Sequence, residues 1–217
     1  NIVSSIIERL DKIKLNINSK KPQKPINIVA VSKTFSLDHI KPLIKVGHEH
    51  FGENKVQEAI SKWQDVKKHN KISLHMVGKL QSNKAKSAAG IFDYIHSLDS
   101  QKLADILSSY EKDNNKFLKY FIQVNIAYET QKSGLPINEV EPFYNYCKIE
   151  KNLDILGLMI IPPNDGNSSK YFKTLSELNV SLGLKDLSMG MSADYLEAIN
   201  HGSTYVRIGS SIFGKRL

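Results

Sequence analysis

The residue with the clearest chemical potential is Lys33, which follows the apolar run 26–31. A lysine at the end of a buried strand is partly desolvated, and desolvation disfavours its ammonium form. The resulting free amine can condense with a carbonyl group to form a Schiff base. The alternative is a lysine whose stem lies on apolar residues while its ammonium group reaches solvent. The spacing alone leaves both interpretations open.

Ser192, Gly209 and Ser210 could together form an anion site. Ser192 is predicted to begin a helix over residues 192–200, and the N–H groups at a helix N-terminus can bind a phosphate. Gly209 and Ser210 follow the last predicted strand and can present backbone N–H groups without steric crowding. Helix capping would explain Ser192 equally well, and a turn would explain the other two. Because the two segments are expected in adjacent loops, they predict a phosphate site.

Two further polar residues are placed by the predicted strands. Asn54 lies at the carboxyl end of the second strand, in the run Phe51-Gly52-Glu53-Asn54. Arg207 is predicted inside the eighth strand, one pleat below Gly209 and on the same side. A charged group at that depth needs a partner, such as a carboxylate or the acceptor nitrogen of a ring.

Two histidines are candidates for a metal site. His48 and His50 alternate on the second predicted strand and could share a face. A metal site would need at least one more ligand. We therefore expect ordinary packing for both histidines and no metal.

Regular alternation of strands and helices positions these residues. Apolar runs predict strands over 26–31, 74–77, 94–98, 120–126, 153–161, 187–191 and 205–208, and one more that ends at Phe51. A helix is predicted after each of the first seven strands, and Ser100 is expected to cap the fourth of these helices. Before the first strand, apolar residues from Ile2 to Ile13 predict an additional N-terminal helix with Ser5 and Glu8 as a capping box. The pattern predicts an α/β protein: a single (β/α)8 barrel of the TIM type over residues 1–217.

The composition indicates a globular protein with a lysine-rich surface. Its 217 residues suit one domain, and its formal net charge is +8. Proteins that read nucleic acids use arginine for bidentate contacts, but arginine occurs only at Arg9, Arg207 and Arg216. We therefore expect no nucleic-acid partner. The single Cys147, the absence of a secretion signal and the lack of an apolar run of bilayer length predict a cytoplasmic protein without membrane contact.

The order of several motifs resembles one known family. They are AVSKT (30–34), FGEN (51–54), GKLQSNK (78–84), GLM (157–159), LSMGMS (187–192) and VRIG (206–209). Over residues 26–214 the chain resembles the pyridoxal-phosphate homeostasis proteins, which are related in fold to the barrel domain of alanine racemase. The resemblance departs at Lys55, where the family usually has Tyr, at Leu74, where Trp is common, and at Ser210, which replaces Thr but keeps a hydroxyl group.

The resemblance implies a site for pyridoxal 5′-phosphate (PLP). It implies that Lys33 forms the Schiff base and that Arg207 lies at the pyridine nitrogen. It further implies that Ser192, Gly209 and Ser210 bind the phosphate group and that Asn54 lies near the ring. The departure at Lys55 puts any stacking role of that position in doubt.

Two classes of function remain. We expect a monomeric PLP-binding protein that serves intracellular PLP homeostasis, with no catalytic residues, and with apo forms of PLP-dependent enzymes as recipients. The alternative is a PLP enzyme that acts on amino acids, such as a racemase. Alanine racemase takes its second base from a separate domain, whereas this sequence ends at Leu217, soon after the eighth strand. Lys132, after the fifth strand, could assist transfer of PLP, or could be a solvated loop lysine.

Overall fold

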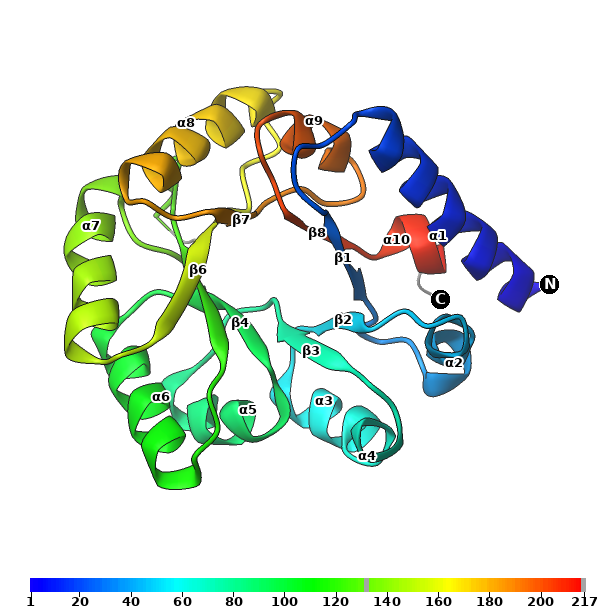
Figure 1. Ribbon diagram of the computed structural model, residues 1–217, viewed down its shortest axis with the longest axis horizontal. Coiled ribbons are helices and arrows are strands. Elements are labelled where there is room, and N and C mark those ends of the chain that lie inside the picture. The colour runs from blue at the N-terminus through cyan, green and yellow to red at the C-terminus, as the bar shows by residue number, and fades with distance from the viewer. Residues whose placement is uncertain (131–132, 216–217) are drawn as a thin grey trace.

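The computed structural model describes residues 1–130 and 133–215, and the strands in this part form one closed barrel (Figure 1). The strands are β1 (Asn27–Val31), β2 (His50–Glu53), β3 (Ser73–Met76), β4 (Tyr94–Leu98), β5 (Lys119–Gln123), β6 (Asp154–Met159), β7 (Asp186–Ser188) and β8 (Tyr205–Ile208). The helices are α1 (Ile2–Ser19), α2 (Leu37–Lys45), α3 (Val56–Trp63), α4 (Val66–His69), α5 (Ala85–Ile91), α6 (Gln101–Asn114), α7 (Ile137–Asn145), α8 (Ser168–Ser181), α9 (Tyr195–Asn200) and α10 (Ser210–Phe213). A 3-10 turn (Ser82–Lys84) precedes α5, and a π-helical turn (Tyr146–Glu150) follows α7.

The strands pair in parallel, each with the next along the chain, and β8 pairs with β1 to close the barrel. In the register of β1, Ala30 lies opposite Phe51 on one side and Ile208 on the other. The predicted (β/α)8 barrel with an additional N-terminal helix is therefore confirmed. Because all strands run the same way, the residues that follow them gather at one end of the barrel.

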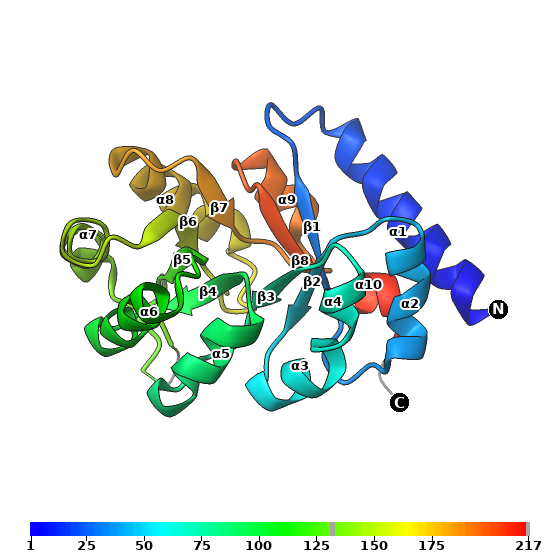
Figure 2. The ribbon, with the colours of Figure 1, turned by 60° about the horizontal axis from the view of Figure 1, so that its bottom comes forward.

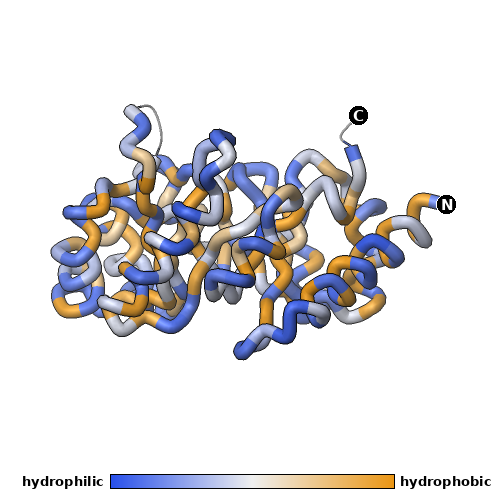
Figure 3. The backbone as a smooth tube through the Cα atoms, turned by 90° about the horizontal axis from the view of Figure 1, so that it is seen from above, coloured by the Kyte–Doolittle hydropathy of each residue, from blue (hydrophilic) through white to orange (hydrophobic). Residues whose placement is uncertain are grey.

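The helices surround the barrel on its outside (Figures 1 and 2). Their apolar residues belong to the buried core. In α1 the buried residues recur at helical spacing, as Ile6, Leu10, Ile13 and Ile17. This helix packs beside α2 and α10. Hydrophobic and hydrophilic segments alternate along the backbone, and the projecting loops are mainly hydrophilic (Figure 3). Within residues 1–130 and 133–215, every helix is too short or too polar to span a lipid bilayer.

The predicted start of α1 is wrong in detail. The helix begins at Ile2, and the side chain of Asn1 accepts a hydrogen bond from the N–H of Ser4 at 2.9 Å. Ser5 and Glu8 lie inside the helix and do not form its cap, because Asn1 already caps the first turn. By contrast, the predicted cap of α6 is confirmed, since Ser100 accepts from the N–H of Leu103.

Several predicted strands are too long, because the chain bends before the apolar run ends. The predicted strand 120–126 ends at Gln123, after which Val124 forms a bridge with Leu135 of the following loop. The predicted strand 187–191 ends at Ser188, and Gly190 then adopts a φ angle of 103° that turns the chain. The predicted strand 153–161 is likewise reduced to β6.

Candidate functional site

A cavity of about 850 Å³ opens at the carboxyl end of the barrel. Its volume is within the range of small-molecule sites. All the residues that the sequence singled out for binding line it: Lys33, Asn54, Ser192, Arg207, Gly209 and Ser210. Val31, Phe35, Val77 and Ile161 supply apolar surface, so the cavity combines apolar walls with polar groups from different loops. We refer to it below as the carboxyl-end cavity.

Lys33 is placed in the cavity by the turn after β1. It follows the end of the strand by two residues and is half-buried. The next residue, Thr34, has a φ angle of 69°, which is uncommon for a residue with a branched side chain. Its N–H donates to Glu58 Oε2 at 2.6 Å, and this charge-assisted bond stabilises the turn that presents Lys33.

Glu53, at the end of β2, stabilises the same turn through Ser32, the residue before Lys33. Its buried carboxylate accepts from Ser32 Oγ at 2.5 Å, from Trp63 Nε1 at 2.9 Å and from Lys62 Nζ at 3.1 Å. Burial raises the pKa of Glu53, while the charge of Lys62 and these hydrogen bonds oppose the rise. Lys62 Nζ also donates to the carbonyl of Ser32 at 2.8 Å, so the residue before Lys33 is bound at both its side chain and its backbone.

Neither Glu53 nor Lys62 was among the predicted site residues. The signal available was an acidic residue at the end of a buried strand, within the FGEN run, because a buried charge requires a partner. Which lysine would supply that partner could not be read from spacing. Lys62 lies on the outer helix α3, and only the packing of α3 against β2 brings the two groups together.

Ser192 does not begin a helix, and this part of the prediction is wrong. Asp194 Oδ1 accepts from the N–H of Met191 at 2.7 Å, so the chain forms a turn there and α9 begins only at Tyr195. Ser192 Oγ instead accepts from the N–H of Ser211, in α10, at 3.2 Å. This contact joins the loop after β7 to the loop after β8, and brings Ser192 beside Gly209 and Ser210 as the sequence predicted.

Gly209 lies at the junction of β8 and α10. A Cβ atom added to it would lie 3.4 Å from the carbonyl oxygen of Val31, which is ordinary contact, and only atoms of Val31 lie within 4 Å among the described residues. Gly209 also lines the carboxyl-end cavity. The glycine therefore leaves room for a ligand to approach the backbone.

Arg207 lies in the cavity wall, as predicted, and is buried. Its guanidinium donates to Ser188 Oγ and, at 2.8 Å, to the carbonyl oxygen of Ile160. Burial lowers the pKa of Arg207 to about 10, which still leaves it cationic at neutral pH. Within the described part of the chain it forms no ion pair with a carboxylate.

Asn54 follows β2 directly, and its position depends on Gly78 after β3. A Cβ atom on Gly78 would lie 2.6 Å from Cβ of Asn54 and 2.8 Å from its carbonyl oxygen. Only glycine therefore allows these two loops to approach so closely beside the cavity. The glycine belongs to the GKLQSNK motif, but the sequence did not indicate that its neighbour would be Asn54.

The predicted pairing of His48 and His50 on one strand is wrong. His48 precedes β2 and its Nε2 bonds to the carbonyl of His50 at 2.8 Å, whereas His50 begins the strand. Among residues 1–130 and 133–215, no group of three or more His, Cys, Asp or Glu side chains could hold a metal ion. Lys132 lies outside the described residues.

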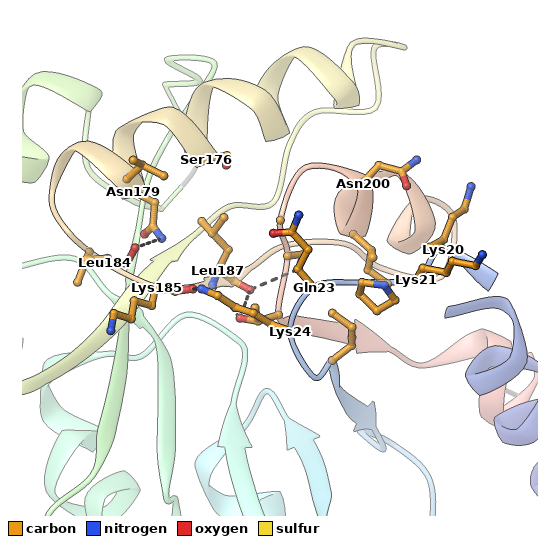
Figure 4. A pocket seen from close by; sticks show the side chains of 17 residues that line it. Lys20, Lys21, Gln23, Lys24, Ser176, Asn179, Leu184, Lys185, Leu187 and Asn200 are labelled. Atoms are coloured by element: carbon orange, nitrogen blue, oxygen red, sulfur yellow. Dashed lines mark hydrogen bonds between the residues drawn. The ribbon is translucent and has the colours of Figure 1, made fainter. Parts of the chain in front are cut away.

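A different hollow lies at the opposite, amino end of the barrel (Figure 4). It is lined by Lys20, Lys21, Lys24 and Lys185 among others, and by none of the predicted site residues. Lys24 Nζ donates to the carbonyl of Lys185 at 2.7 Å, which joins the segment before β1 to the segment before β7. At this end of a barrel such contacts serve stability, so the candidate functional site is the carboxyl-end cavity.

Comparison with known proteins identifies the family. Residues 9–216 match the family described as alanine racemase, N-terminal domain. A pyridoxal phosphate homeostasis protein of Vibrio alginolyticus is 40% identical over 202 residues, which cover 88% of this chain and 87% of that protein. The chain belongs to the pyridoxal phosphate homeostasis protein family. The resemblance inferred from the motifs is thereby confirmed.

Solved structures agree with the fold of this homeostasis-family protein. PipY of Synechococcus elongatus, solved with PLP bound, has a TM-score of 0.86 and 32% identity, with 96% of this chain and 100% of that chain covered. An alanine racemase of Clostridium difficile has a TM-score of 0.75 at 15% identity, with 98% of this chain and 57% of that chain covered. The second likeness shows the barrel fold alone.

Proposed function

We propose that this protein binds PLP in the carboxyl-end cavity through a Schiff base with Lys33, and that it serves intracellular PLP homeostasis without substantial catalysis of its own. The main support is that Lys33, Asn54, Ser192, Arg207, Gly209 and Ser210 line one cavity, although they come from segments far apart in the sequence. A second support is the family itself, whose PipY member was solved with PLP bound.

The chemistry of the cavity fits PLP at each end of the ligand. PLP carries a phosphate, a ring nitrogen that accepts hydrogen bonds, and an aldehyde. Ser192 and the backbone at Gly209 and Ser210 lie where adjacent loops meet, and suit the phosphate. The buried cation of Arg207 suits an acceptor nitrogen, and Lys33 supplies the amine for the aldehyde.

Each residue contributes a distinct step to holding and releasing the ligand. The amine of Lys33 condenses with the aldehyde, with loss of water, and water or another amine reverses the bond. Bound PLP can serve as an electron sink in catalysis when its ring nitrogen is protonated. Arg207, a cation beside that nitrogen, disfavours this protonation and so weakens the electron sink. The half-buried position of Lys33 leaves the bond accessible to an incoming amine.

This access suggests how the protein would act in the cytoplasm. Free PLP is a reactive aldehyde that condenses with exposed amines, and a reversible Schiff base limits that reaction while keeping PLP available. The recipients we propose are apo forms of PLP-dependent enzymes, whose own lysine amines would take up the released aldehyde.

The site assignment is tested by reduction with borohydride and peptide mapping. PLP-loaded protein should carry the pyridoxyl group on Lys33, and Lys33→Ala should abolish both the label and the visible absorbance. Lys55→Ala is the matched control, because Lys55 lies near the cavity rim beside Asn54 and should leave both signals intact. Recovery of the label mainly on another lysine of the wild-type protein would contradict the assignment.

The absence of substantial catalysis needs its own test. PLP-loaded protein is incubated with L-alanine and other amino acids, and optical purity and keto-acid formation are followed. We expect neither rapid racemisation nor transamination. Turnover of about 10 per second, a typical enzyme value, would instead assign the protein to the racemase-like class.

A further inference from the structure

Polar side chains form a continuous hydrogen-bonded chain through the inside of the barrel. His50 Nδ1 lies 2.9 Å from His75 Nε2, and His75 Nδ1 lies 2.8 Å from His96 Nε2. His96 Nδ1 lies 2.7 Å from Ser188 Oγ, which also contacts the guanidinium of Arg207. We call His50, His75, His96 and Ser188 the histidine chain. It begins at a hollow at the amino end of the barrel, lined by His50, and ends at Arg207 in the carboxyl-end cavity.

The direction of the hydrogen bonds in this chain, from donor to acceptor, follows from the donors available. The guanidinium of Arg207 can only donate, so Ser188 Oγ accepts from it. Among the described residues, His96 Nδ1 is the single acceptor within reach of the Ser188 hydroxyl proton. His96 Nδ1 is therefore unprotonated, and the proton of this imidazole lies on Nε2.

The same logic fixes the remaining imidazoles. His96 Nε2–H donates to His75 Nδ1, and His75 Nε2–H then donates to His50 Nδ1. The opposite set of tautomers would leave the buried Ser188 hydroxyl proton without an acceptor, which is costly in a dry interior. It would also turn the positive ends of the ring dipoles toward Arg207, whereas the assigned tautomers turn their negative ends toward that cation.

The rings are fixed in place by aromatic neighbours. Tyr94 stacks on His75 with 4.0 Å between ring centroids, and Phe121 stacks on His96 at 4.6 Å. His75 and His96 are fully buried, and burial lowers the pKa of each well below its usual value. Both imidazoles are therefore neutral at neutral pH, as the assigned direction requires.

We propose that His75, His96 and Ser188 are positioning residues, which orient the guanidinium of Arg207 for the ring nitrogen of the ligand. Arg207 forms no ion pair in the described part of the chain, so a carboxylate does not fix its orientation. Its orientation depends on two neutral acceptors, Ser188 Oγ and the carbonyl of Ile160. The histidine chain keeps the first of these an acceptor, because it takes the hydroxyl proton away from Arg207. This positioning role rests on the proposed function, whereas the direction of the chain does not.

The direction is tested on the protein without ligand. Correlation spectra of the histidine ring nitrogens and carbon-bound protons distinguish protonated from unprotonated nitrogens. We expect protonated Nε2 and unprotonated Nδ1 in His75 and His96. In Ser188→Ala, the Nδ1 signal of His96 should shift because its donor is lost. Protonated Nδ1 in His75 and His96 of the wild-type protein would overturn the proposal.

The positioning role is tested by comparing two ligands. One is PLP, and the other is its 1-deaza analogue, in which a CH group replaces the ring nitrogen. Ser188→Ala and His96→Phe should each weaken PLP binding roughly tenfold, which corresponds to about 1.4 kcal/mol. Neither should change the affinity for the analogue, which has no nitrogen for Arg207 to contact. His201→Gln, on the outer surface, is the control and should bind both ligands like the wild type.

The outcomes separate this inference from the proposed function. Equal losses for PLP and for the analogue, or no loss for either, would show that the histidine chain does not act through the ring nitrogen. If wild-type protein bound neither ligand, the proposed function would fail and the positioning role with it, while the tautomers would still report the direction. Thermal unfolding measurements verify that each variant is folded. Should His96→Phe fail to fold, Ser188→Ala, which removes a single oxygen atom, provides the test.

Discussion

The most discriminating substitution is Gly209→Ala, because it separates the fold from the proposed phosphate site. The added Cβ would lie 3.4 Å from the carbonyl oxygen of Val31 and 3.6 Å from its Cβ, with no closer neighbour among the described residues. The φ angle of Gly209 is −114°, which alanine also adopts. We therefore expect the unliganded variant to fold with a free energy of unfolding within about 1 kcal/mol of the wild type.

The effect on PLP should be much larger. Gly209 lines the cavity, and we propose that the phosphate approaches its backbone closely, so an added methyl group should keep the phosphate away from the backbone N–H groups. Loss of one hydrogen bond to a charged group costs about 1.5–3 kcal/mol, which corresponds to roughly 10- to 150-fold in affinity. Pyridoxal, which has the same ring and aldehyde but no phosphate, should bind the variant and the wild type equally.

The assay is a titration followed by visible absorbance, with urea unfolding of the unliganded proteins. Gly90→Ala is the control, since it makes the same change in α5, with Tyr110 Oη at 3.4 Å and no contact with the cavity. Equal losses of PLP and pyridoxal would refute the phosphate assignment. A large fall in the stability of Gly209→Ala would show that the fold does not accommodate a Cβ atom at this position.

Other substitutions test separate parts of the argument. Ser192→Ala should weaken PLP about 10- to 150-fold but leave pyridoxal unchanged in the same titration; equal losses would mean that Ser192 serves only the N–H of Ser211. Gly157→Ala would place a Cβ 1.6 Å from the carbonyl oxygen of Asp186, so β6 and β7 should separate and urea unfolding should show a severely destabilised protein, whereas a wild-type midpoint would contradict this contact. Burial lowers the pKa of His48 to about 4. Between pH 6.5 and pH 4 the unfolded chain therefore binds a proton that the folded protein does not, and the free energy of unfolding decreases as the pH is lowered. His48→Gln should reduce the slope of unfolding free energy against pH in this window by up to ~1.4 kcal/mol per pH unit, and an unchanged slope would argue against the burial of this imidazole.

The barrel and the residues around its cavity could be predicted from the sequence because the relevant signals are local. Apolar runs and helical spacing depend on neighbours a few residues apart, and parallel strands must end at a common edge. That rule alone gathers Lys33, Asn54 and Gly209 at one end, and the structure agrees. The wrong helix and strand ends come from local turns that spacing did not reveal. The side chain of Asp194 accepts a hydrogen bond in a turn, so α9 begins later than predicted, and Gly190 turns the chain after β7.

The order of the elements, the closed barrel and the identity of the strand-end residues therefore follow from local sequence signals. Which polar groups meet depends instead on how the elements pack in three dimensions. Glu53 and Lys62 pair because α3 packs on β2, and the histidine chain exists because β2, β3, β4 and β7 all face the same interior. Contacts across a barrel depend on its closure and on the register of every strand. Spacing along one segment does not contain that information, so a buried polar chain of this kind becomes visible only once the barrel is closed.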